Sequence, residues 1–145
     1  PDDYLEHILG HDRLEKLNPI RTFRDNNIVV SFGSDAPCTT PDPIVWMDRA
    51  VNNDNAGQAV SVQDALRMCT YNGAWAAFDE QERGSLEAGK IADMAVLSEN
   101  PYTVPKDKLS CLRVERLYLS GKSYESCRES ILPMMLRGLT SRNKA

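Results

Sequence analysis

The feature that most constrains the fold of this chain is residues 28–32, Ile-Val-Val-Ser-Phe, a nearly continuous apolar and β-branched run. Such a run is typical of a strand that is buried on both faces of a parallel sheet. Gly33, Ser34 and Asp35 follow it directly, and a proline-rich loop comes next. The pattern therefore predicts a strand of an α/β fold that ends just before Asp35.

Helices are predicted on both sides of this strand. Asn18-Pro19 and Asp42-Pro43 each have the form of a helix start, with a capping side chain and then proline at the first helical position. Residues 61–64, Ser-Val-Gln-Asp, resemble a capping box in which Asp replaces the usual Glu or Gln. Apolar residues behind it recur at helical spacing, and residues 74–78 form one more short helical piece.

The pattern changes from helical to strand-like near Gly84. Residues 94–97 form a short apolar strand, and residues 112–119 alternate between apolar and charged side chains. Ser120-Gly121 is typical of a hairpin turn into a further strand. The second part of the chain is therefore predicted to be β-structure, followed by helical spacing over residues 127–139.

These elements indicate an α/β fold in three parts. Residues 1–83 match the end of a β/α barrel of the TIM type, with its last strand and the helices beside it. Residues 84–125 form a C-terminal β-module, part of a small β-sandwich, and residues 126–145 form a helical tail. The change of pattern near residue 84 predicts that the β-module packs separately from the helices.

Charge and cysteine content exclude several classes of protein. The net charge is −4 and the isoelectric point about 5.2, whereas nucleic acids and anionic membranes call for basic surfaces. No apolar run approaches the ~20 residues of a membrane span, and no signal-peptide pattern opens the sequence. The four cysteines form no CxxC pair and are interpreted as reduced thiols. We therefore expect a cytoplasmic protein whose partners include neither nucleic acid nor membrane.

Asp35 is the strongest candidate for chemistry, because barrel enzymes place catalytic groups just past the C-terminal ends of their strands. The hard oxygens of a carboxylate suit a divalent metal, and they can accept a proton from water whose pKa the metal has lowered. Taken alone, Gly-Ser-Asp-Ala-Pro fits a strand-to-loop turn better, with Asp35 capping a backbone N–H. The local pattern leaves both interpretations open.

Three segments, in order, resemble the metal-dependent amidohydrolase superfamily. Residues 30–37, Val-Ser-Phe-Gly-Ser-Asp-Ala-Pro, are similar to its eighth barrel strand and the loop that follows. Residues 65–78 are similar to its last barrel helices, and residues 84–97, which begin Gly-Ser-Leu-Glu-Ala-Gly-Lys, to its C-terminal signature. With Asp42-Pro43 after the loop, the pattern is most similar to the branch of N-acyl-amino-acid deacylase-like and exoenzyme-regulator-like proteins. The resemblance covers residues 15–125.

The resemblance implies that Asp35 is the strand-eight aspartate of this family, which ligates a catalytic metal or hydrogen-bonds to the attacking water and acts as general base. It also implies that the intact enzyme binds a divalent metal, with zinc as the first candidate. The other site residues of the family are a His-x-His on the first strand, a bridging Lys or Glu on the fourth, and histidines on the fifth and sixth. None has a counterpart in this chain, which is therefore expected to be a C-terminal portion that is inactive and binds no metal alone.

His7 and His11 are the two histidines of the chain. Spaced as His-x3-His, they would face one side of a helix and could bind zinc. Gly10 weakens such a helix, no Glu follows His7 directly, and no third ligand is evident. Solvent-exposed histidines are the better interpretation.

Four further residues are interpreted as structural rather than functional. Asp93, at the head of a predicted strand, is interpreted as a turn carboxylate. Trp46, Trp75 and Phe78 could shape a substrate pocket, but aromatic residues at helical spacing more often belong to the core.

Two hypotheses for the function follow. In the first, the intact protein hydrolyses the C–N bond of a small-molecule amide, such as an acylated amino acid or a cyclic amide, with Asp35 as metal ligand and base. In the second, the chain is a non-catalytic assembly or regulatory module derived from an amidohydrolase. An upstream stretch of about 300 to 400 residues with a His-x-His on a strand would favour the first. The chain alone is expected to self-associate, because its predicted barrel strand has open edges.

Overall fold

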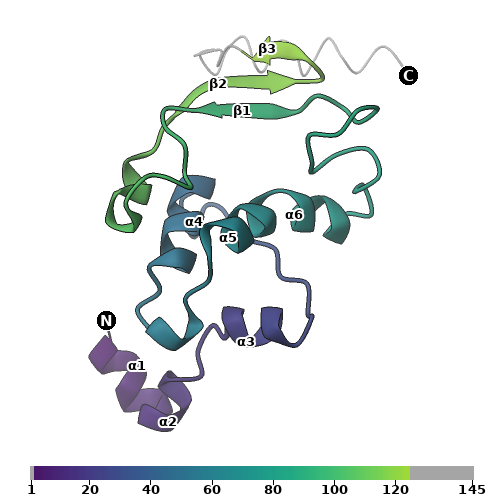
Figure 1. The fold of residues 1–145 in the computed structure, drawn as a ribbon. Coiled ribbons are helices and arrows are strands. Elements are labelled where there is room, and N and C mark those ends of the chain that lie inside the picture. The colour runs from purple at the N-terminus through teal and green to yellow at the C-terminus, as the bar shows by residue number, and fades with distance from the viewer. Residues whose placement is uncertain (1, 125–145) are drawn as a thin grey trace, which may run out of the picture.

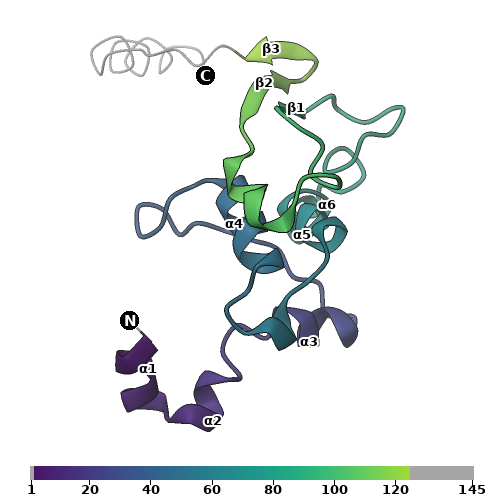
Figure 2. The same cartoon turned by 60° about the vertical axis from the view of Figure 1, so that its left-hand side comes forward.

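The computed structural model describes residues 2–124 of the chain. Its elements are α1 (Asp2–Leu9), α2 (His11–Leu14), α3 (Ile20–Asp25), α4 (Pro43–Val51), η1 (Ala56–Gln58), α5 (Val62–Cys69), α6 (Tyr71–Ala76), β1 (Met94–Leu97), η2 (Lys106–Cys111), β2 (Val114–Leu119) and β3 (Lys122–Tyr124). α1 and α2 lie at one end of the molecule and a small antiparallel sheet at the other (Figure 1). A second view also places α4 and α5 between these two ends (Figure 2). The fold is mixed α/β.

Local capping groups decide where the helices begin. Asp42 caps α4, because its carboxylate accepts a hydrogen bond at 3.0 Å from the backbone N–H two residues further on. Ser61 and Asp64 form the predicted capping box at the start of α5. The helix starts predicted at Asp42 and Ser61 are therefore confirmed. α3 begins one residue later than predicted, because Pro19 rather than Asn18 is its capping residue.

The core lies between α4, α5 and η2. Its buried hydrophobic side chains are Met47, Ala50, Val51, Val60, Ala65, Met68, Leu109 and Leu112. The last two come from the connection between β1 and β2, and Leu109 is 0% exposed. The connection between β1 and β2 thus contributes two side chains to the core that the helices form.

The sheet contains the strands predicted at residues 94–97 and 112–119, although the second begins at Val114. β2 is central and pairs antiparallel with both β1 and β3. Ser120 and Gly121 form the predicted turn between β2 and β3, with φ values of 51° and 75°. Positive φ at both positions is what a two-residue type I′ hairpin turn requires.

Asp93 holds this hairpin turn against the start of β1. Its carboxylate accepts a hydrogen bond from the backbone N–H of Ser120 at 2.8 Å and another from the guanidinium of Arg83 at 2.7 Å. Both carboxylate oxygens are therefore engaged within the chain. The predicted structural role of Asp93 is confirmed.

The loop from Gly84 to Lys90 packs against α6. Gly84 has a φ of +86°, and a Cβ built on it would lie 2.7 Å from the Cβ of Ala74 and 3.0 Å from the Cα of Tyr71. A side chain does not fit at this distance, so glycine is required. The Lys90 side chain is 13% exposed, and its ammonium donates to the backbone carbonyl of Glu80 at 2.7 Å. The glycine-bracketed motif is therefore a structural anchor for α6.

The strand predicted at residues 28–32 is not observed, because no strand among residues 2–124 pairs with it. Exposure nevertheless alternates along residues 29–35, with the even-numbered positions half-buried and the odd-numbered ones exposed. This period of two is that of an extended chain. The apolar run is thus extended as predicted, but its hydrogen-bonding partners are helices rather than strands.

Three of the four cysteines lie within the described part of the chain. Cys38, Cys69 and Cys111 are free thiols, and Cys127 lies with the predicted helical tail outside the described residues. Burial raises the pKa of Cys69 to about 11, so this thiol stays protonated at neutral pH. Within residues 2–124 no helix combines the length and apolar character needed to cross a bilayer.

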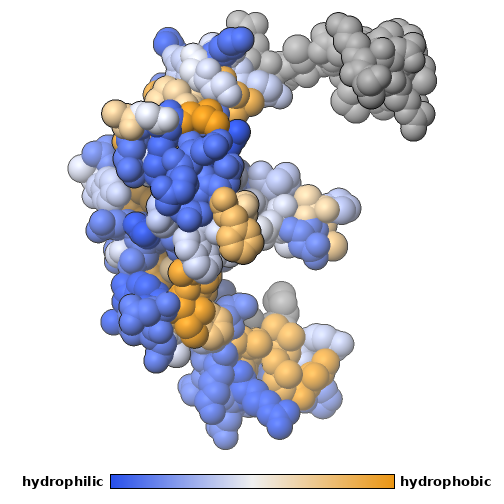
Figure 3. Space-filling view, turned by 90° about the vertical axis from the view of Figure 1, so that its right-hand side faces the viewer, coloured by the Kyte–Doolittle hydropathy of each residue, from blue (hydrophilic) through white to orange (hydrophobic). Residues whose placement is uncertain are grey.

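Large hydrophobic side chains also remain on the surface. Figure 3 shows apolar side chains gathered at the α1–α2 end and further patches toward the sheet. Trp75 is 46% exposed and Phe78 is 94% exposed, so the prediction that these aromatic residues belong to the core is wrong. α6 ends at Ala76, before Phe78. The residue that α6 buries is Asn72 rather than an aromatic side chain.

Candidate active site

Asp35 lies on an exposed turn that follows residues 28–34. Its φ is +48°, in the left-handed region that Asp tolerates better than most residues. The hydroxyl of Ser34 caps the turn by accepting a hydrogen bond at 3.1 Å from the N–H of Ala36. The backbone N–H of Cys38 then donates to the carbonyl oxygen of Asp35 at 2.9 Å.

No hydrogen bond within residues 2–124 uses the side-chain carboxylate of Asp35. The capping role that the local pattern favoured for Asp35 is performed by Ser34. The Asp35 carboxylate is thus exposed and available to a ligand.

The segment that leads to Asp35 is held by the junction of α5 and α6. The side-chain amide of Asn72 donates to the carbonyl oxygen of Val30 at 2.7 Å, and the N–H of Phe32 donates to the carbonyl oxygen of Met68 at 3.3 Å. The side chains of Val30 and Phe32 pack against the core. Sequence reasoning missed Asn72, because its partner Val30 is 42 positions away and the two residues share no local motif.

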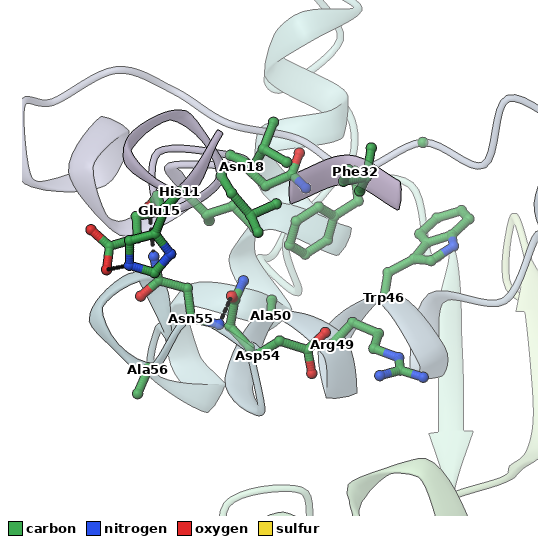
Figure 4. Close-up of a pocket in the computed structure, with 16 residues that line it drawn as sticks. His11, Glu15, Asn18, Phe32, Trp46, Arg49, Ala50, Asp54, Asn55 and Ala56 are labelled. Carbon is green, nitrogen blue, oxygen red and sulfur yellow. Dashed lines mark hydrogen bonds and ion pairs between the residues drawn. The ribbon is translucent and has the colours of Figure 1, made fainter. Parts of the chain in front are cut away.

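Two open cavities border this segment. The larger, of about 920 Å³, is lined by Phe32 and Gly33 and by Trp46 and Arg49 of α4. Figure 4 shows Phe32 and Trp46 on one side of this space, with Arg49 and Asp54 below them. The smaller cavity, of about 380 Å³, borders residues 28–30 on the α5–α6 side. Asp35 itself lines neither cavity, and Trp46 lines the larger one rather than the core.

Within the described residues, Asp35 is not part of a cluster of metal-ligating side chains. No group of three His, Cys, Asp or Glu side chains within residues 2–124 could hold an ion. Asp35 offers the hard oxygen donor that divalent cations accept, whereas a catalytic zinc needs about three protein ligands. Asp35 alone therefore does not make a catalytic metal site within residues 2–124.

His7 and His11 do not form a metal site together. Gly10 separates α1 from α2 with a φ of 75°, so the two histidines lie on different helices. The His11 side chain is 70% exposed and lies 3.4 Å from Glu6 and 3.5 Å from Glu15. This arrangement agrees with the predicted surface role of His11.

A sequence model described as the amidohydrolase family matches residues 1–124. The chain belongs to the amidohydrolase family. The match spans all three of the motifs that carried the resemblance, including the turn at Asp35 and the loop that begins at Gly84.

Individual relatives agree with this assignment. The amidohydrolase chain is 40% identical over 113 residues to an N-substituted formamide deformylase of Arthrobacter pascens, which covers 73% of this chain and 21% of that protein. It is 30% identical over 100 residues to a 5-methylthioadenosine/S-adenosylhomocysteine deaminase of Thermoanaerobacter pseudethanolicus, which covers 63% of this chain and 23% of that protein. The chain thus spans between a fifth and a quarter of the length of these curated relatives.

A solved structure shows the same relation in three dimensions. The crystal structure of an amidohydrolase from Thermotoga maritima MSB8 superimposes with a TM-score of 0.59 and 25% sequence identity. The superposition covers 73% of this chain and 25% of the Thermotoga chain. Most of this chain therefore matches about a quarter of the Thermotoga amidohydrolase.

Proposed function

We propose that the intact protein hydrolyses C–N bonds of non-peptide amides in a metal-dependent reaction, with Asp35 as metal ligand and general base. The observation that carries the proposal is the exposed Asp35 carboxylate, which has no partner within residues 2–124. Named relatives support the bond class, since one is a formamide deformylase and another a deaminase. The substrate would be a small amide.

The architecture of the intact enzyme belongs to the same proposal. Residues 28–32 would be the last strand of a β/α barrel, and β1–β3 would be part of a small β-sandwich. Open cavities border residues 28–33, which supports placing neighbouring barrel strands beside this segment. Because Asp35 follows the segment, it would lie at the C-terminal end of the barrel, where such enzymes place catalytic groups. The free thiols support a reducing, cytoplasmic setting.

The chemistry requires proton movements that one carboxylate can perform. A bound divalent cation, with zinc as the first candidate, would polarise the carbonyl group as a Lewis acid and lower the pKa of water. Asp35 would accept the proton that water loses as its oxygen adds to the carbonyl carbon. It would then give that proton to the nitrogen as the C–N bond breaks. The left-handed turn at Asp35 holds the carboxylate outside the packed helices, where a substrate can reach it.

Replacing Asp35 in the intact protein tests this proposal. Asp35→Asn keeps the size of the side chain but removes the base, so hydrolysis of an N-alkylated formamide, followed by formate release, should fall by about 10³-fold. Zinc content should fall as well, while thermal unfolding of the metal-free protein stays unchanged because the carboxylate makes no hydrogen bond within the described chain.

Asp107→Asn is the matched control, since Asp107 is an exposed aspartate in η2. It should leave both formate release and zinc content unchanged. An Asp35→Asn protein that keeps more than about a tenth of wild-type turnover would contradict the role of general base. An intact, metal-replete protein that hydrolyses no amide in a panel of acylated amines and cyclic amides would favour the non-catalytic module.

A further inference from the structure

Asn72 is the buried polar residue of the described chain, with 9% of its surface exposed. Its side-chain nitrogen donates a hydrogen bond of 2.7 Å to the backbone carbonyl of Val30, a residue 42 positions away in the sequence. Leaving a buried amide without a partner is costly, so the amide holds Val30 in a defined position. The contact ties α6 directly to the segment that carries Asp35.

The break between α5 and α6 supplies a second tie. The last carbonyl groups of a helix have no partner within it. In α5, the carbonyl oxygens of Leu66 and Arg67 accept hydrogen bonds from the hydroxyl and the N–H of Thr70. The next carbonyl, that of Met68, accepts the N–H of Phe32 at 3.3 Å. The helix end is therefore satisfied in part by the segment that leads to Asp35.

The two ties act on the same edge of the segment. In an extended chain the backbone groups of residues two apart point the same way, so Val30 and Phe32 present one edge to the helix junction. The turn that follows is closed by its own hydrogen bonds at Ser34 and Asp35. With the edge fixed and the turn closed, the direction in which the Asp35 carboxylate leaves the chain is set by the position of α6.

Gly84 in turn fixes the position of α6. A Cβ at Gly84 would come within 3.0 Å of the Cα of Tyr71, the residue next to Asn72. The glycine-bracketed loop therefore packs directly against the turn of α6 that carries the amide. The loop thus meets Tyr71, the adjoining Asn72 holds Val30, and the backbone leads from Val30 to Asp35.

We propose that Asn72 is a positioning residue for Asp35: its amide fixes the edge of residues 30–32 and thereby the placement of the catalytic carboxylate. The inference rests on the proposed function of Asp35. Asn72 does not touch the substrate, and it acts through the backbone of Val30. Residues that hold a metal-binding side chain in place typically change activity or metal affinity 10- to 100-fold when they are replaced.

The experiment compares Asn72→Leu, which keeps the branched shape of the side chain but removes the donor, with Asn72→Gln, which keeps the amide. Both are made in the intact protein, loaded with Co²⁺ and assayed with an N-alkylated formamide. Asn72→Leu should lower kcat by about 10- to 100-fold with KM within about twofold, and should shift the visible absorption bands of the bound Co²⁺. Asn72→Gln should recover most of kcat and the wild-type bands.

Leu66→Ala is the matched control, because Leu66 packs against the same core but makes no side-chain hydrogen bond to residues 28–34. It should lower the melting temperature without moving the Co²⁺ bands or kcat measured well below that temperature. The proposal is overturned if Leu66→Ala reproduces the effects of Asn72→Leu, or if Asn72→Leu leaves kcat and the bands unchanged.

Two further comparisons keep the result decisive. Should Asn72→Leu not fold, Asn72→Asp takes its place with the same expectations, because an ionised carboxylate fits the space but cannot donate to Val30. A normal Asp35→Asn enzyme would refute the proposed function itself. An inactive Asp35→Asn enzyme beside a normal Asn72→Leu enzyme would refute only the positioning role.

Discussion

Three aspartates illustrate how partners within the chain distinguish structural carboxylates from available ones. Asp93 has both oxygens engaged, by the hairpin turn and by Arg83. Asp64 accepts hydrogen bonds from Ser61 and Arg24. Asp35 has no side-chain partner within residues 2–124, and its turn is closed by other groups. The Asp35 carboxylate is thus left available to a group outside the described chain.

Asp64 predicts an acid-sensitive contribution to stability. Burial raises the pKa of Asp64, but hydrogen bonds from Ser61 and Arg24 outweigh it and hold the pKa below its ordinary value of 3.8. Because the folded-state pKa lies below the unfolded one, the ionised carboxylate stabilises the fold above pH 3.8, and this contribution is lost as pH falls through the folded-state pKa. Asp64→Asn should lower stability near pH 7 by about 1 kcal/mol and flatten the loss of stability in acid.

Thermal unfolding between pH 7 and pH 2.5 measures this effect in the intact protein. Asp107→Asn, on the exposed first turn of η2, should leave the pH profile parallel to that of the wild type. If Asp64→Asn keeps the full acid-dependent loss, the Ser61–Asp64 capping box does not carry it.

At the scale of single residues, the sequence predicted what depends on near neighbours. The capping roles of Asp42 and Ser61 are set by groups two or three positions away, and both were predicted correctly. Asn72 was not, because its partner Val30 is 42 positions away and nothing near Asn72 marks the contact. Asp35 was selected by resemblance to a family, since its local pattern favoured a turn.

Among the elements, the same distinction separates the helices from the segment at 28–32. Helix hydrogen bonds are local, so periodicity and caps located α4 and α5 well. A strand requires a second strand, and none within residues 2–124 lies beside residues 28–32. The hairpin of β2 and β3 was predictable because its partner is adjacent and Ser120-Gly121 specifies the turn.

Gly84 makes the junction between the loop and α6 testable at this scale. Gly84→Ala should destabilise the intact protein by about 2–4 kcal/mol, because the new Cβ meets α6 and the left-handed backbone disfavours a side chain. The measurement is urea unfolding. The glycine has a φ of +86° and its Cβ would lie 2.7 Å from the Cβ of Ala74.

Gly89→Ala separates the two causes. Gly89 has a φ of +97°, but nothing lies within 4 Å of a Cβ built there. Its replacement should therefore cost only the backbone strain, about 1–2 kcal/mol. Equal losses for the two variants would show that close packing of the loop on α6 contributes nothing, and would also weaken the link from this loop to Asn72.

For the whole molecule, much large apolar surface in the described chain stays uncovered. Eight hydrophobic residues form the buried core of the described chain, whereas sixteen large hydrophobic residues are exposed. The chain matches between 21% and 25% of the length of its relatives. Neither the apolar patches nor the cavities beside residues 28–33 could be read from local sequence, because both depend on which surfaces the rest of the fold covers.

Residues 1–145 produced alone should therefore self-associate, bind no stoichiometric zinc and hydrolyse no amide. Ile28 and Val29 are 52% and 43% exposed. The backbone groups of Val29, Ser31 and Gly33 make no hydrogen bond within the described chain. Such an open apolar edge pairs with other chains, and a lysine on it blocks the pairing. Val29→Lys should shift the protein toward monomer in sedimentation velocity, by about tenfold in the association constant.

Val45→Lys is the control for this experiment, because Val45 is 38% exposed but lies on the outer side of α4. It adds the same charge without touching the open edge and should leave the association unchanged. If the two lysines weaken association equally, then net charge or general apolar surface controls the association, and the edge at residues 29–33 does not. A monomer of the unchanged chain that binds one zinc and releases formate from an N-alkylated formamide would contradict the view of Asp35 as one ligand of a larger site, since a single carboxylate cannot hold a catalytic zinc.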